Sequence, residues 1–493
     1  MRSLRFRLLL FLCASLALLA QSLAEFEKRV TEFTLPNGLH FILLERHEAP
    51  VVSFHTYVNA GSVDDPCGKT GLAHMFEHMA FKGTETIGSK GYAEEKKALE
   101  AVERAYDRLD AERVPERRRA LQEQLEAAME QAAGYVDVNA YPRLIEENGG
   151  AGLNAETGED ATNYFYSLPS NRIELWFLLE SGRFRAPVFR EFYKERDVVR
   201  EERRMRVESN PEGGLEEMLL ATAFAAHAYR QPTAGWASDI ERLRVGDARA
   251  FFEKYYAPAN ITVAIAGDVD PAAARRLAEK YFGPIPARPL PTPLSTAEPA
   301  QRGEKRVAVE TPAQPFLAMA WKRPDQHDND DPVFDVIAEI LSSGRTGLLY
   351  RELVRDRAIA LSASATATFP GGKYPNLFLI WVAPSSGHTT AENETVIEGI
   401  LDGLKAKEPD PQTMARVKTK IRASLVRQLD DNPGMADELT FYAVNYGGWR
   451  KMFTALDDID RVTAADVRRV VGQYFVASGR TVAFTVPPKG GVQ

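Results

Sequence analysis

The alternation of apolar and polar residues predicts short strands and amphipathic helices along the chain. Runs of β-branched and aromatic residues predict four early strands, at Val30–Leu35, Leu39–Leu44, Val51–Val58 and Thr162–Leu168. The first two flank Pro36-Asn37-Gly38, a turn sequence typical of β-hairpins. Apolar residues at helical spacing predict helices at Ile173–Phe184 and Phe189–Met205. We therefore expect an α+β protein.

A more polar pattern occupies Tyr92–Gly134. Its apolar residues keep helical spacing among many charges on both sides of Pro115, at Leu99, Val102, Tyr106, Leu109, Leu121, Leu125, Ala128 and Ala132. Such a narrow apolar seam predicts a charged helical hairpin. We expect the hairpin to pack on itself in solvent, and docking of a partner protein is the alternative role.

A long-range repeat divides the chain into two parts. The segment Leu243–Gly267 resembles Val462–Val486 at an offset of 219 residues, and each pairs a helix pattern with a β-branched strand. Between them, Phe282–Gln301 contains six prolines, as a stiff extended linker does. We predict two homologous α+β halves, each an antiparallel-rich sheet flanked by helices. The expected parts are a signal peptide at 1–24, an N-terminal domain at 25–282 with an insertion at about 92–134, a linker at 283–304 and a C-terminal domain at 305–493.

The first 24 residues have the pattern of an export signal. Three arginines precede the 13-residue apolar run Leu8–Ala20, and Ser22-Leu23-Ala24 is a small-x-small cleavage site. The run is shorter than the ~20 residues that cross a bilayer; an uncleaved anchor is the alternative. We expect an exported protein, periplasmic in a Gram-negative bacterium, without membrane insertion after cleavage. The net charge of −8 gives no reason to expect a nucleic-acid partner.

The sequence His74-x-x-Glu77-His78 carries the clearest candidate chemistry. In a helix, His74 and His78 share one face a turn apart, which suits two ligands of one zinc ion. Glu77 projects toward the same region, where it can take a proton from a water activated by zinc. An amphipathic helix with two chance histidines is the alternative. The equivalent run in the second half, Pro332–Leu341, has no histidine, so only the first half can hold a metal in this way.

Two glutamates of the predicted helix Phe189–Met205 are candidates for the same site. Glu195 and Glu202 are two turns apart on one face, with Val198 and Val199 between them and Met205 one turn beyond, and this face is expected to be buried. A carboxylate on a buried face needs a strong partner, and a metal ion would serve. A salt-bridged surface helix is the competing explanation.

A glycine-rich stretch precedes the strand Thr162–Leu168. Glycines beside a strand permit close backbone approach, which fits an edge that pairs with an extended peptide. The candidate substrate-binding residues are Gly152, Leu153, Asn154 and Ala155. A glycine-rich turn before an ordinary hairpin is the alternative.

Four sequence blocks together resemble the pitrilysin/insulinase family of zinc peptidases, and in particular its processing-peptidase-like bacterial members. They are HMFEHMAFKGT, NAETGEDATNY, ERDVVREE and HAYRQPTAGW, in family order within Val30–Val486. The resemblance implies zinc ligands at His74 and His78 and a general base at Glu77. It also implies a third ligand at Glu202, with Glu195 as a further functional glutamate and Glu201 as the off-by-one alternative. The usual family spacing would place that ligand at Ala155, and the charged insertion supplies most of the difference.

The same resemblance implies an exported zinc metalloendopeptidase with one Zn²⁺ per chain. It would act on peptides or unfolded polypeptide segments, which pair as a strand with Gly152–Ala155 inside a clamshell of two halves. Complete relatives carry an Arg and a Tyr in the second half, but the matching positions here are Val354 and Leu361. We therefore expect a homologous partner subunit to supply that half of the site in a heterodimer, with a homodimer as the alternative. A non-catalytic scaffold or a peptide-binding subunit of the same fold remains the other function.

Overall fold

Two mixed β-sheets organise the protein in a computed structural model that describes residues 25–488. The first sheet has the strand order β1-β2-β6-β3-β5-β4, and the second has the order β7-β11-β8-β10-β9. The strands of the first sheet are β1 (Val30–Thr34), β2 (His40–Glu45), β3 (Val51–Val58), β4 (Ala151–Thr157), β5 (Thr162–Pro169) and β6 (Ile261–Gly267). Those of the second are β7 (Lys305–Glu310), β8 (Leu317–Arg323), β9 (Ala360–Phe369), β10 (Asn376–Pro384) and β11 (Arg480–Val486). The expected export signal at residues 1–24 lies outside the described residues.

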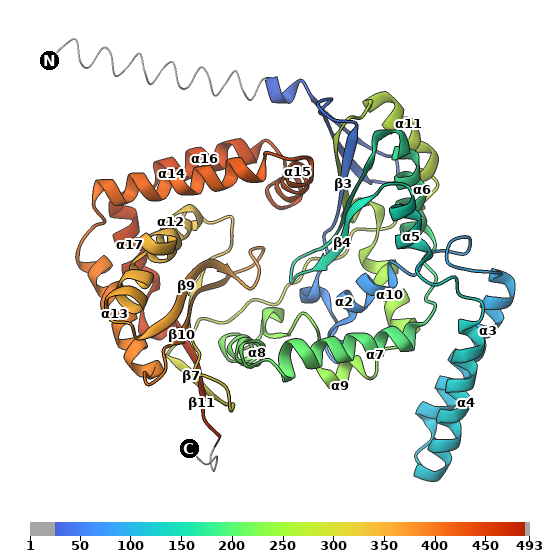
Figure 1. Cartoon of the computed structure of the whole chain (residues 1–493), viewed down its shortest axis with the longest axis horizontal. Helices are drawn as coiled ribbons and strands as arrows, with labels where there is room; N and C mark the ends of the chain where they lie inside the picture. Colours follow the sequence, from blue (N-terminus) through green and yellow to red (C-terminus); the bar gives the residue numbers. More distant parts are fainter. Residues whose placement is uncertain (1–24, 489–493) are drawn as a thin grey trace.

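Helices flank both sheets, so the predicted α+β architecture of two homologous halves in a clamshell is confirmed (Figure 1). The first half contains α2 (Leu72–Met79), α3 (Tyr92–Ala111), α4 (Pro115–Ala133), α5 (Ala140–Glu147), α6 (Ile173–Arg185), α7 (Phe192–Arg203), α8 (Pro211–Ala223), α9 (Ala237–Ile240), α10 (Val245–Tyr255) and α11 (Pro271–Tyr281). The second contains α12 (Asp331–Ser342), α13 (Thr390–Ala406), α14 (Pro411–Gln428), α15 (Asn432–Tyr446), α16 (Lys451–Arg461) and α17 (Ala464–Tyr474).

The repeated segment occupies the same place in both halves. In the first half α10 leads through a 3₁₀ turn into β6, and in the second α17 leads through a 3₁₀ turn into β11. Strand β6 lies parallel to β2 and antiparallel to β3. Strand β11 likewise lies parallel to β7 and antiparallel to β8. The sequence repeat therefore encodes the central strand of each sheet.

Each half also lends a helix to the other half's sheet (Figure 1). Helix α8 packs on β7, β8 and β11, and its fully buried Leu219 belongs to an apolar cluster with residues of the second sheet. Helix α15 packs on β3 and β6, and its fully buried Leu439 belongs to a cluster with residues of the first sheet. The two halves are thus joined by apolar packing in addition to the chain between them.

The proline-rich stretch between the halves, residues 286–302, forms neither helix nor strand. It is nevertheless held in place, because the Glu298 carboxylate accepts hydrogen bonds from the backbone N–H groups of Ala225, Ala226 and His227. The stretch is therefore attached to the segment that follows the C-terminal end of α8.

Helices α3 and α4 form the charged hairpin, which projects from the first half (Figure 1). The hairpin packs on itself and also contacts the body at both ends of α3. The ring of Tyr106 stacks on Tyr193 of α7 with a centroid distance of 4.3 Å. Glu95 is fully buried and makes an ion pair with Arg190, just before α7. Removing either partner of such a buried pair would leave a costly unpaired charge, so the hairpin base is firmly attached.

The helix expected at Phe189–Met205 is shorter than predicted and faces differently. It runs from Phe192 to Arg203 and continues as a π-helical turn, Arg204–Glu208. Val198 and Met205 are 45% and 57% exposed, so their assignment to the buried face was wrong. Val199 is fully buried as expected, because the helix turns that side of its two glutamates toward the core. No helix within residues 25–488 is long and apolar enough to cross a membrane.

Candidate metal centre

The helix that carries the histidines, α2, begins at a closely packed point. Gly71 precedes it with φ of 84°, and a Cβ there would meet the Ala234 carbonyl oxygen at 2.6 Å. The buried carboxylate of Asp65 accepts the N–H groups of Gly71, Leu72 and Ala73 at 2.7, 3.2 and 2.9 Å. These bonds satisfy N–H groups that a helix start leaves free, and they place negative charge at its positive end. The start of α2 is therefore fixed in position and direction.

Three predicted ligands converge on one point. His74 and His78 project from α2, and Glu202 reaches them from α7. Glu202 Oε2 lies 3.7 Å from His74 Nε2 and 3.4 Å from His78 Nε2. Within residues 25–488, these three form the only group of His, Cys, Asp or Glu side chains close enough to share a metal, with all donor atoms within 4.8 Å of one another.

This donor set fits zinc. Ligands at about 2.0–2.1 Å from a tetrahedral zinc lie about 3.3 Å from each other, close to the separations between the glutamate and the two imidazoles. Two imidazoles and one carboxylate also leave a fourth position open, as in catalytic zinc sites. The other carboxylate oxygen, Glu202 Oε1, is held by Arg206 at 2.7 Å, which directs Oε2 toward the histidines. Glu201 points elsewhere and pairs with Arg204, so it does not join the group.

Glu195 supports the site from a position on α7 two turns before Glu202. Its Oε2 lies 3.4 Å from His78 Nδ1, the ring nitrogen that faces away from Glu202. Its Oε1 pairs with Lys82, which also contacts Glu191 at 3.1 Å. A carboxylate on the second nitrogen of a ligating histidine fixes the ring's tautomer and orientation. His74 lacks such support, since its Nδ1 is buried without a partner among the described residues.

The charges of the cluster favour a cation. The hydrogen bond with His78 is the main cause that lowers the pKa of Glu202 to about 2. Although burial acts in the opposite direction, hydrogen bonds with His78 and Lys82 lower the pKa of Glu195 to about 2. Burial lowers the pKa of His74 to about 4, so its imidazole is neutral near pH 7. Although burial acts in the opposite direction, hydrogen bonds with Glu195 and Glu202 raise the pKa of His78 to about 9, so a metal ion would displace the proton of this imidazole. Ionised carboxylates and neutral imidazoles are the forms in which these groups bind metals.

Glu77 lies on the same helix but outside the ligand group. It lines a cavity of about 420 Å³ together with His78, Phe81, Lys82 and Glu195. Its Oε2 accepts a hydrogen bond of 2.6 Å from Thr157, at the end of β4. Burial raises the pKa of Glu77 above its ordinary value. A carboxylate that borders a metal centre without ligating is well placed to accept and release a proton.

The four predicted substrate-binding residues lie in β4, the edge strand of the first sheet. Gly152 and Asn154 are exposed, whereas Leu153 and Ala155 are partly buried against the core. The pairing of β4 with β5 is irregular between Ala151 and Asn154, where Gly152 has φ of 68°. β4 also packs against α2, so this free edge runs beside the histidine helix.

Two family models match the chain. The insulinase model, peptidase family M16, matches residues 41–130 and 125–236, and the model of the peptidase M16 inactive domain matches residues 242–421. The chain belongs to the insulinase family. The insulinase match comes in two pieces that meet within α4, so the hairpin interrupts the family pattern.

Known members of the insulinase family resemble this chain over most of its length. Zinc protease PqqE of Helicobacter pylori is 24% identical over 466 residues, which are 92% of this chain and 92% of that relative. A probable mitochondrial-processing peptidase subunit beta of Arabidopsis thaliana is 24% identical over 91% of this chain and 76% of that protein. The crystal structure of a protease from Helicobacter pylori shares the fold, with a TM-score of 0.78 and 23% identity over 93% of this chain and 99% of its own. The similarity to relatives that are named zinc proteases supports a peptidase-like function for this member of the insulinase family.

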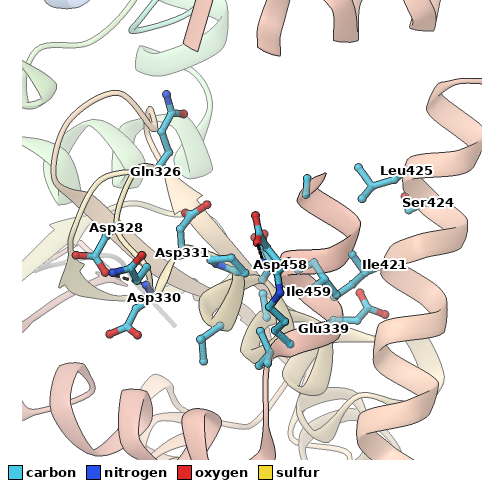
Figure 2. Close-up of a pocket in the computed structure, with 18 of the residues that line it drawn as sticks. Gln326, Asp328, Asp330, Asp331, Glu339, Ile421, Ser424, Leu425, Asp458 and Ile459 are labelled. Atoms are coloured by element: carbon cyan, nitrogen blue, oxygen red, sulfur yellow. Dashed lines mark hydrogen bonds and ion pairs between the residues drawn. The ribbon is translucent and has the colours of Figure 1, made fainter. Parts of the chain in front are cut away.

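In the half that matches the inactive domain of the insulinase family, the described residues 305–488 line a cavity but include no group of three His, Cys, Asp or Glu side chains close enough to share a metal ion. A cavity of about 1120 Å³ lies between α12, α14 and α16, and Figure 2 shows carboxylates such as Asp331 and Asp458 around it. Here α12 carries Asp335 and Glu339 on the cavity face, and Glu339 is paired with Lys420 of α14 at 2.7 Å. None of the cavity's described lining residues on α14 is a carboxylate.

The positions that match the family's second-half Arg and Tyr lie near the start of β9. Val354 is partly buried in the π-helical turn Tyr350–Asp356, and Leu361 is 59% exposed on β9. Two arginines lie close to these positions: Arg355 is paired with Asp356 at 2.6 Å, and Arg357 lies 3.6 Å from Glu352. Both arginines are thus occupied by neighbouring acids on their own element.

Four supporting residues were missed by sequence reasoning: Asp65, Lys82, Thr157 and Arg206. Arg206 follows Glu202 by four residues, a spacing that could have suggested the pair. Lys82 lies in the block HMFEHMAFKGT, which marks it as part of the site but not as the partner of Glu195. Asp65 and Thr157 make hydrogen bonds with α2 from a loop and a strand, and no local sequence pattern predicts such contacts.

Proposed function

We propose that this protein is a zinc metalloendopeptidase that hydrolyses peptides or unfolded polypeptide segments. The observation that carries the proposal is the convergence of His74, His78 and Glu202 beside a glutamate that does not ligate. A bound zinc ion would polarise the substrate carbonyl and lower the pKa of water in the site. His74, His78 and Glu202 would hold that ion.

The chain's own residues account for the proton movements of this reaction. Glu77 takes a proton from the attacking water as the new carbon–oxygen bond forms at the peptide carbonyl. It then gives that proton to the leaving nitrogen as the carbon–nitrogen bond breaks. Glu195 and Lys82 hold the His78 ring in place throughout, because Glu195 contacts His78 Nδ1.

Substrate would bind as an added strand along β4. The free edge at Gly152–Ala155 offers unpaired backbone groups to an extended peptide, and main-chain pairing is largely independent of sequence. Such pairing needs an extended chain, which favours peptides and unfolded segments over folded proteins. We accordingly assign Gly152, Leu153, Asn154 and Ala155 to substrate binding.

We further propose that a homologous partner subunit completes the site. Val354 and Leu361 cannot donate the hydrogen bonds that the family Arg and Tyr provide, and one relative is named as subunit beta of a processing peptidase. The purified single chain should therefore cleave peptides slowly, and a co-purifying homologue should restore the rate. A single chain with a full peptidase rate contradicts this part of the proposal.

Export and the domain division are also proposed. The basic and then apolar pattern of residues 1–24 supports removal of a signal before Glu25. N-terminal sequencing of the mature protein tests this, and a mature chain that retains Met1 contradicts it. We place the boundary between the two domains in residues 283–304, which include the stretch without helix or strand.

A scaffold or peptide-binding subunit of the same fold is the second candidate, because the second half matches an inactive domain. Glu77→Gln separates the two functions, since it removes the base and leaves the ligands intact. We expect one zinc per chain in both proteins by mass spectrometry, and loss of peptide hydrolysis by at least about a hundredfold in the variant. Unchanged hydrolysis in Glu77→Gln would exclude the proposed mechanism, and absence of hydrolysis in the wild-type complex would favour the scaffold.

A further inference from the structure

Thr157 makes the one side-chain hydrogen bond that residues 25–488 provide to Glu77. Its Oγ1 lies 2.6 Å from Glu77 Oε2. Because the hydroxyl occupies Oε2, the remaining oxygen, Oε1, is left for a water molecule. A carboxylate with one oxygen fixed cannot rotate freely about its last bond, so the other oxygen has a defined direction.

The strand pattern of β4 brings this hydroxyl to the helix. Side chains alternate between the two faces of a strand, and in β4 Leu153, Ala155 and Thr157 share the partly buried face. Leu153 and Ala155 pack against the core cluster that includes α2. The β-branched side chain of Thr157 has few rotamers, which helps to hold its hydroxyl at one place.

The end of β4 is fixed by contacts from both halves. Thr157 pairs with Thr162 of β5. Three residues after Thr157, the Asp160 carboxylate accepts the N–H groups of Gly372 and Lys373 in the second half, at 2.9 and 3.0 Å. The position of the Thr157 hydroxyl thus depends on the fold of the whole chain, not on α2 alone.

We infer that Thr157 is a positioning residue that couples the peptide-binding strand β4 to the general base Glu77. The inference rests on the proposed function. The same strand, β4, would align the scissile peptide and orient the Glu77 carboxylate, so the position of the base relative to the peptide is set by one element. Loss of the hydroxyl should therefore impair the proton transfer and leave peptide binding and metal binding intact.

The test compares Thr157→Val, which keeps the shape and removes the hydroxyl, with Thr157→Ser, which keeps the hydroxyl. Thr366→Val is the matched control, because Thr366 is exposed on β9, the edge strand of the second sheet. Each protein is loaded with zinc and assayed, with any subunit that co-purifies, on an internally quenched unstructured peptide. Binding of the same peptide to the metal-free proteins is measured by fluorescence anisotropy.

We expect Thr157→Val to lower kcat by about tenfold to a hundredfold, the effect of losing one hydrogen bond to a charged group. KM, zinc content and peptide affinity of the metal-free protein should stay within about twofold, and Thr157→Ser should recover most of kcat. An unchanged kcat in Thr157→Val overturns the inference. So does weaker peptide binding in that variant, or an equal loss in Thr157→Ser, because either result indicates a structural role for the strand. An inactive wild-type complex instead overturns the proposed function, so the two failures are distinguishable.

Discussion

Helices α2 and α12 occupy equivalent places in the two halves but carry different chemistry. Helix α2 packs against α7 and α10, and α12 packs against α14 and α17. On one face of α2 stand the buried His74 and the partly buried Glu77 and His78, and Glu202 of α7 approaches the two histidines. On the equivalent face of α12 stand Asp335 and Glu339, opposite Lys420 of α14, in the cavity of Figure 2.

This difference shows that the architecture of a half does not require a metal. The second half builds an equivalent sheet and similar helix packing without a histidine on α12; the histidine that lines its cavity, His327, lies in the loop before that helix. An ion pair between Glu339 and Lys420 borders the open cavity of the second half, where α2 and α7 of the first half bring histidines and a glutamate together. We therefore expect loss of the proposed ligands on α2 and α7 to affect activity far more than folding.

The largest expected effect comes from Glu202→Gln. Removal of a charged ligand should weaken zinc binding by more than about a hundredfold, beyond the loss that supporting residues cause, and hydrolysis should fall with it. The matched control is Glu201→Gln on the neighbouring exposed position, which should leave both properties unchanged. Zinc affinity is measured by competition with a chromogenic chelator. If the two variants behave alike, the third ligand has been misassigned.

A second effect tests the exchange of helices between the halves. Leu439→Ala on α15 and Leu219→Ala on α8 each truncate a fully buried side chain that packs against the sheet of the other half. Each should lower the free energy of unfolding by about 2–5 kcal/mol. Val426→Ala, on an exposed position of α14, serves as the control in chemical denaturation. If only one of the two leucine variants shows a large loss in the free energy of unfolding, the two helices do not contribute equally to joining the halves.

The smallest expected effect concerns Asp335 in the cavity of the second half. Desolvation by the cavity walls, helped by the charge of Asp331, raises the pKa of Asp335 to about 7 although its side chain is exposed to the open cavity, whereas an unfolded aspartate titrates near about 3.9. The folded protein therefore holds this proton more tightly, and that stability is lost as the pH rises from about 4 to about 7. Asp335→Asn should raise the melting temperature at pH 8 but not at pH 4, and only on the order of 1 °C, because the open cavity admits solvent. Asp402→Asn, on the exposed side of α13, is the control. A higher melting temperature of Asp335→Asn at pH 4 but not at pH 8 would contradict the predicted pH dependence.

Local patterns in the sequence predicted much of this fold. The strands β1, β2, β3 and β5 and the helix α6 lie within one or two residues of their expected bounds, because alternation and helical spacing report directly on burial. The repeat and its proline-rich connection predicted two halves. The bounds and the buried face of α7 were less well predicted, because Val198 and Val199 lie on opposite sides of the glutamate stripe and sequence does not say which side meets the core.

The candidate site likewise contains some residues that local sequence spacing predicts and others that only the folded structure brings together. The i, i+4 spacing of His74 and His78 marks a shared helix face, so the first two ligand candidates were visible in the sequence. The proximity of Glu202 was inferred only through the family resemblance, since 124 positions separate it from His78. The contacts of Asp65 and Thr157 depend on turns and strand register, which hydrophobic patterns do not encode.

The most direct test of the account is anomalous X-ray diffraction at the zinc absorption edge from crystals of the purified protein. The account predicts one strong peak per chain, within bonding distance of His74, His78 and Glu202, and none in the cavity of the second half. A zinc-supplemented crystal with no peak between these three residues, or with its peak beside Asp335 and Glu339, would contradict the central claim.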